Sequence, residues 1–159
     1  MGQIIQIKAD LPKPLFYREL EKQLRVVLGD ESNRISRMAT VASVLGETKK
    51  FLWAGFYLVE GDELVLGPFS GPLACFRIKK GRGVCGTAWA TEKAILVPNV
   101  HDFPGHIACS SLSNSEIVIP IRDRNKKKII GVLDIDHVDV NGLDEDDLQG
   151  FKNIADLIG

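Results

Sequence analysis

Apolar residues recur at helical spacing near both ends of the chain. Leucine and valine side chains between residues 15 and 28 repeat mainly every three or four positions, and Gly29 ends that pattern. A second helix is predicted after Ser32, its expected N-cap, and it ends at Gly46. A last helix is predicted to start near Asp144. The apolar stripes of the second and last helices are Ile35, Met38, Ala39, Ala42 and Leu45, and Leu148, Phe151, Ile154, Ala155 and Ile158.

The middle of the chain has the alternation and the aromatic and β-branched content of short strands. The predicted strands are residues 52–59, 63–69, 75–78, 94–97, 115–122 and 129–137. A short helix is predicted after the glycine-rich run 81–86, and residues 98–114 form a long loop, which in a compact domain is usually functional or disordered. This order of elements predicts an α+β fold, a single domain over residues 1–159 with a mostly antiparallel central sheet and helices packed on one face.

Alternation along the first strand gathers two aromatic rings on one face. Trp53, Gly55 and Tyr57 share that face, because successive side chains of a strand point to opposite sides. Two interpretations stay open. Gly55 leaves a space between the rings that suits an apolar or cationic group, or it makes room for a packed neighbour.

Three acids lie on adjacent predicted strands. Asp134 and Asp136 share one face, about 6.6 Å apart along the chain, and Glu116 lies in an otherwise apolar run. A buried acid needs a partner, so these acids either pair with arginines such as Arg77 or Arg82, or line a pocket for a cationic ligand. No lysine or arginine is interleaved with the three acids where they lie on these adjacent strands, which favours the pocket. Crowded carboxyl groups tend to keep one proton, which creates a general acid.

The chain has three cysteines, Cys75, Cys85 and Cys109. Their spacing lacks the close pairs of a zinc site, so no metal is predicted, and a buried inert cysteine is the commonest alternative. Cys109, however, follows His106 in a polar loop, an environment that stabilises a thiolate. Two cysteines that approach in space can act as an attacking and a resolving pair.

Composition excludes several classes of protein. A net charge of -1, with 26% charged and 45% hydrophobic residues, favours neither nucleic acid nor an anionic membrane as a partner. Residues 1–7 have no secretory pattern, and no run reaches the roughly 18 apolar residues of a membrane span. Residues 81–86 match the dinucleotide glycine pattern but lack the strand and the βαβ unit that it requires. An odd cysteine count suits a reducing compartment, so we predict a cytoplasmic protein, and a homodimer is compatible with the sequence.

Several ordered motifs together resemble the free methionine-(R)-sulfoxide reductase family. They are residues 67–75 (GPFSGPLAC), 81–88 (GRGVCGTA), 100–109 (VHDFPGHIAC), 113–120 (SNSEIVIP) and 131–136 (GVLDID). The resemblance spans nearly the whole chain and is strongest over residues 52–137. It implies a single GAF-type domain, which agrees with the predicted order of elements.

The resemblance also implies how the cysteines act. Cys109 would attack the sulfur of free methionine-(R)-sulfoxide and become a sulfenic acid. Cys75 would resolve it into a disulfide, and Cys85 is the third cysteine, with a part in recycling. No bound cofactor is implied, because thioredoxin would reduce the disulfide with electrons from NADPH through thioredoxin reductase.

For the pocket, the resemblance implies that Trp53 and Tyr57 surround the methyl sulfoxide end of the substrate. Glu116, Asp134 and Asp136 would hold the substrate ammonium and help to protonate the leaving oxygen. The alternatives are a non-enzymatic GAF module that senses a small ligand, and a thiol peroxidase. A sensor module needs no attacking thiol and normally accompanies an output domain, for which we expect no room in 159 residues.

Overall fold

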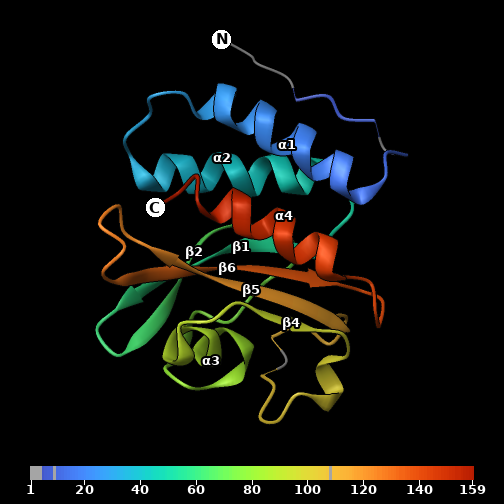
Figure 1. Cartoon of the computed structure of the whole chain (residues 1–159). Coiled ribbons are helices and arrows are strands. Elements are labelled where there is room, and N and C mark those ends of the chain that lie inside the picture. The colour runs from blue at the N-terminus through green and yellow to red at the C-terminus, as the bar shows by residue number, and fades with distance from the viewer. Residues whose placement is uncertain (1–4, 9, 108) are drawn as a thin grey trace.

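The described residues of the computed structural model, 5–8, 10–107 and 109–159, fold into one six-stranded antiparallel sheet with helices on both faces (Figure 1). The strands are β1 Trp53–Glu60, β2 Glu63–Ser70, β3 Arg77–Lys79, β4 Ile95–Val97, β5 Ser115–Arg122 and β6 Ile129–His137. The helices are α1 Lys13–Leu28, α2 Arg34–Glu47, α3 Gly83–Thr91 and α4 Glu145–Ala155, with a short 3-10 turn at Val100–Asp102. The strand order is β3-β2-β1-β6-β5-β4.

The ends of the helices follow local capping chemistry. The N-cap of α2 is Asn33 and not Ser32 as predicted, because the Asn33 side chain accepts a hydrogen bond from the Ser36 amide at 3.0 Å. Asp144 caps α4 as expected and forms a reciprocal capping box with Asp147. The predicted bounds of these helices are therefore correct to within a few residues.

Helices α1, α2 and α4 cover one face of the sheet, and α3 packs on the opposite face with the loop before β5 (Figure 1). The α+β fold with a central antiparallel sheet is confirmed. The expectation of helices on one face holds for α1, α2 and α4, and α3 adds a second layer. Two apolar clusters result, one beneath α1, α2 and α4 and one between α3 and the sheet.

Strand register brings the predicted site residues together at the centre of the sheet. Strand β6 lies between β1 and β5, so Asp136 is opposite both Trp53 and Glu116. Asp134 is opposite Gly55 on β1. The predicted alternation is confirmed, because Ala54 and Phe56 pack beneath α1, α2 and α4, while Trp53 and Tyr57 belong to the cluster between the sheet and α3. No helix in the described part of the chain is long and apolar enough to span a membrane.

Candidate active site

A cavity lies between the first turn of α3, the centre of the sheet and the loop that carries Cys109. Seven of the eight predicted site residues line it: Trp53, Tyr57, Cys85, Cys109, Glu116, Asp134 and Asp136. The eighth, Cys75, is attached to the cavity through its bond to Cys109. Residues from β1, β5, β6, α3 and two loops thus meet at one place.

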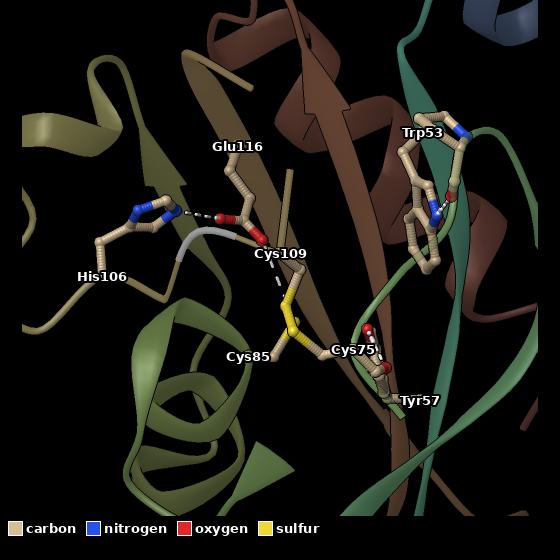
Figure 2. The surroundings of a disulfide bond; sticks show 8 residues. Trp53, Tyr57, Cys75, Cys85, His106, Cys109 and Glu116 are labelled. Carbon is tan, nitrogen blue, oxygen red and sulfur yellow. Dashed lines mark hydrogen bonds and ion pairs between the residues drawn. A yellow bond between two sulfur atoms is a disulfide. The ribbon is translucent and has the colours of Figure 1, made fainter. Parts of the chain in front are cut away.

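Cys75 and Cys109 form a disulfide, with their Cα atoms 5.4 Å apart and a sequence separation of 34 (Figure 2). Both cysteines are half-buried. The Tyr57 hydroxyl donates a hydrogen bond to the Cys75 carbonyl at 2.9 Å, which fixes the segment before β3 against β1. The pairing that the resemblance implied is therefore present in the structure.

The three acids lie side by side on β5 and β6, with Glu116 and Asp134 buried and Asp136 half-buried. Glu116 is 6% exposed and Asp134 is 5% exposed. The His106 ring nitrogen Nε2 lies 3.6 Å from Glu116 Oε1, and Ser113 donates a hydrogen bond to Asp136 at 3.1 Å. Asp134 Oδ1 is buried without a hydrogen-bond partner among the described residues. A buried polar atom without a partner carries a substantial free-energy cost, so this oxygen is a natural contact for a ligand donor.

Burial decides the protonation of this cluster. Burial raises the pKa of Glu116, the neighbouring Asp136 charge adds to the rise, and a hydrogen bond with Asp134 opposes both effects, so that the pKa is about 8. Burial and the adjacent acids also raise the pKa values of Asp134 and Asp136 well above the usual range. Arg77 does not neutralise the cluster, because its guanidinium pairs with Glu63 at 3.5 Å. Of the two interpretations of the acids, pairing with arginines or lining a pocket for a cationic ligand, the structure therefore supports the pocket.

Cys85 lies at the start of α3 and is a free, buried thiol. Its sulfur is 4.0 Å from Glu116 Oε2 (Figure 2). Burial raises the pKa of this thiol well above its ordinary value, and the charges of Asp134 and Glu116 add to the effect. Potential ligand atoms of these three residues lie within 4.8 Å of one another, so they could hold a metal ion, although a protonated thiol favours hydrogen bonds. That the chain binds no metal stays a prediction.

The aromatic residues form a packed wall. Trp53 and Tyr57 are 3% and 2% exposed, and their rings stack with centroids 5.9 Å apart. Phe69 stacks on the other side of Trp53 at 5.3 Å. A Cβ atom at Gly55 would collide with Phe69 and with the Trp53 ring. Gly55 therefore makes room for packed neighbours, as one of the two sequence interpretations stated. The other interpretation, an open space between the two rings, is wrong.

The predicted site residues did not include His106, Ser113 and Arg82, although the sequence analysis named His106 beside Cys109 and Arg82 as a possible partner of the acids. His106 and Ser113 contact the acids directly, and Arg82 lines the cavity from the start of α3. The position of His106 three residues before Cys109 was a usable signal. Nothing in the local pattern indicated Ser113, because the loop that carries it approaches the sheet only in the folded chain.

Comparisons with known proteins agree with this arrangement. The sequence model of the GAF domain family matches residues 33–159. The free methionine-R-sulfoxide reductase of Escherichia coli is 44% identical over 144 residues, which are 90% of this chain and 86% of that protein. GAF domain-containing protein A of Dictyostelium discoideum is 52% identical over 143 residues, 89% of each chain.

Solved structures are equally similar. The free methionine-R-sulfoxide reductase of Neisseria meningitidis, in complex with its substrate, has a TM-score of 0.91 and 43% identity, and the match covers 98% of this chain and 92% of that one. Extended matches at this identity, in sequence and in structure, establish common membership. The chain therefore belongs to the free methionine-R-sulfoxide reductase family of GAF-domain proteins.

Proposed function

We propose that this protein reduces free L-methionine-(R)-sulfoxide to L-methionine by cysteine redox chemistry. The observation that carries the proposal is the Cys75–Cys109 disulfide at the edge of a cavity with buried carboxyl groups. The thiols supply two electrons, and the acids supply the proton that a leaving oxygen requires. The named functions of the relatives from Escherichia coli and Neisseria meningitidis support the same reaction.

The first step is attack by Cys109 sulfur on the sulfoxide sulfur. As the S–O bond breaks, the oxygen is transferred to Cys109, which becomes a sulfenic acid, and methionine leaves with the electron pair on its sulfur. The thiol proton, or one delivered by the acid cluster, ends on the transferred oxygen. Glu116 suits the delivery, because a pKa of about 8 keeps it protonated at neutral pH and able to act as a general acid.

The second step is attack by the Cys75 thiol on the sulfenic acid, which forms the disulfide and releases water. A reduced thioredoxin would then exchange with the disulfide, and NADPH would regenerate the thioredoxin through its reductase. Cys85 is a poorer resolving thiol than Cys75, because its raised pKa keeps it protonated. We propose that Cys85 holds Glu116 in place through the contact between its sulfur and Glu116 Oε2, and that it has a secondary part in recycling.

Substrate binding uses the two walls of the cavity. Trp53 and Tyr57 offer an apolar surface to the methyl sulfoxide end, and the acids face the ammonium. In the disulfide state the cavity holds only about 40 Å³, roughly the volume of one water molecule. Methionine sulfoxide is larger, so it enters after the disulfide is reduced and the Cys109 loop is released from Cys75.

A coupled assay with thioredoxin, thioredoxin reductase and NADPH tests the proposal. NADPH should be consumed with free L-methionine-(R)-sulfoxide, and only slightly with the S epimer or with methionine sulfoxide inside a peptide. Methionine release should be measured directly, to separate reduction from unrelated oxidation of NADPH. A protein that binds the R epimer without releasing methionine would be a sensor module, and the proposed reaction would be wrong.

A further inference from the structure

Exposed apolar side chains surround the disulfide, and the proposed redox steps give them no role. The described part of the chain exposes four large apolar side chains within three positions of a disulfide cysteine. They are Leu73, Phe76, Ile107 and Leu112, which we call the apolar collar. Leu73 and Phe76 are 89% and 77% exposed. Single exposed apolar residues are common, but a group of them around one reactive bond is typical of a surface that binds another protein.

The folded backbone holds the apolar collar in place on both sides of the disulfide. The Phe76 carbonyl accepts a hydrogen bond from the Leu66 amide of β2 at 2.9 Å, so the segment before β3 is tied to the sheet. The Ile107 side chain packs against the start of α3, because a Cβ atom added at Gly83 would lie 3.2 Å from it. A partner that binds the collar therefore meets side chains that are already ordered, which lowers the entropy lost on binding.

The charges next to the apolar collar are positive. The two segments that carry the disulfide, residues 64–91 and 103–115, contain four lysines and arginines and no aspartate or glutamate. Three of the four are exposed and form no ion pair among the described residues: Lys79, Lys80 and Arg82. The whole chain has a net charge of -1, so this positive charge is a local excess. It favours a partner whose binding surface is acidic.

Disulfide exchange decides which sulfur such a partner attacks. A thiolate of the partner attacks one sulfur, and the other cysteine leaves as a thiolate. Cys109 is the better leaving group, because its loop is polar and carries His106, whereas Cys75 follows Leu73 and Ala74. Attack on Cys75 gives a mixed disulfide and frees Cys109. The second thiol of the partner then closes the partner's own disulfide and releases Cys75, and the two partner protons end on the two cysteines of this chain.

We infer that the apolar collar, with Lys79, Lys80 and Arg82 beside it, is the docking surface for a dithiol protein that has an apolar and acidic surface around its reactive thiol, and that this partner attacks Cys75. The inference rests on the proposed function, which requires a thiol donor, and adds the surface and the sulfur that the donor uses. Four apolar side chains and three charges suffice for such a contact, since transient redox complexes bury less than about 1,200 Å² in total.

The first test compares two reductants of the purified disulfide form, thioredoxin and dithiothreitol. No methionine sulfoxide is present, so the result does not depend on the proposed function. Phe76→Ser and Leu112→Ser change collar residues that do not line the cavity. Each should lower the second-order rate constant with thioredoxin by about tenfold or more, and should not lower that with dithiothreitol, which needs no docking surface. Val26→Ser, 67% exposed on α1 across the sheet, is the matched control and should change neither rate constant.

The second test identifies the attacked sulfur and the role of charge. A thioredoxin whose second active-site cysteine is replaced by serine traps the mixed disulfide, and mass spectrometry of its peptides should find the bond at Cys75. Lys79→Glu should lower the rate constant with thioredoxin several-fold at low salt, and the difference should shrink at about 0.5 M salt.

Three results would overturn the inference: equal losses with both reductants, unchanged rate constants in both collar variants, or a mixed disulfide at Cys109. A wild-type dimer that Phe76→Ser dissociates would assign the apolar collar to a second copy of the chain, and would overturn the inference as well. Normal reduction of the disulfide without any release of methionine in the coupled assay would overturn the proposed function alone.

Discussion

Replacing Glu116 with glutamine should slow the reaction and stabilise the fold. Glutamine has nearly the shape of the protonated acid but carries no proton that it can release to the leaving oxygen. General acid assistance is typically worth about 10²–10⁴-fold, so methionine release in a single turnover should fall by at least about 10²-fold. Because the reacting thiols are unchanged, the loss should appear in the chemical step.

The gain in stability follows from the raised pKa of Glu116. An unfolded chain releases this proton near the ordinary value of 4.5, while the folded chain holds it to about 8. Stability therefore falls as pH rises between these values, and is constant above them. At pH 7, which is about 2.5 pH units above the ordinary pKa of 4.5, Glu116 is protonated in the folded chain and ionised in the unfolded chain. This difference lowers the free energy of unfolding by about 3 kcal/mol at most. Glutamine removes that cost.

Denaturant unfolding of both proteins between pH 4.5 and 8 measures the effect. The stability difference should be near zero at the acidic end and grow with pH. Glu63→Gln, which removes a partly exposed acid paired with Arg77, should change stability by less than about 0.5 kcal/mol and leave the rate unchanged. A difference in stability that does not depend on pH would refute the assigned pKa, and a wild-type single-turnover rate would refute the role of Glu116 as acid.

Three further results are expected. Cys109→Ser should release no methionine even in one turnover, while Cys75→Ser should release about one methionine per protein and then stall with thioredoxin; a full first turnover by Cys109→Ser would exclude it as the attacking thiol. The wild-type single-turnover rate should fall as pH rises above about 8, because the shared proton of the acids is lost; a rate that keeps rising would contradict this. In steady-state kinetics of the wild-type and Asp136→Asn proteins, the substitution should raise KM more than it lowers kcat. A fall in kcat larger than the rise in KM would instead identify Asp136 as the proton donor.

Strand pattern predicted most of the fold because each strand buries at least one face. The predicted bounds of β5 and β6 agree with the structure, since both are long central strands with a strong β-branched content. The third strand was predicted at 75–78 and begins at Arg77 instead, because Cys75 lies in the disulfide segment before it. The residues that mark turns in the sequence could not reveal that Cys75 is held outside the strand by its disulfide with Cys109.

The parts of the site that depend on alternation along a strand could be predicted from the sequence. The parts that depend on how distant segments pack together could not. Alternation placed Asp134 and Asp136 on one face of their strand, and the register of the sheet then brought Trp53 and Glu116 beside them. The contact of Glu116 with His106 depends on how the loop folds back, which no local pattern encodes. The roles of the cysteines came only from the resemblance, because spacing could not choose which two would meet.

The raised pKa of Glu116 depends on helix α3, whose place on the sheet could not be derived from its sequence. Its residues Val84, Ala88 and Trp89 are buried together with its glycines, so it has no polar face and no amphipathic pattern to show which side of the sheet it covers. Yet without α3 the acids of β5 and β6 would face solvent and ionise near their ordinary pKa values. The protonated state of Glu116 on which its proposed role depends is therefore a product of the second helical layer. The same burial that raises the pKa of Glu116 to about 8 also lowers the stability of the fold at neutral pH.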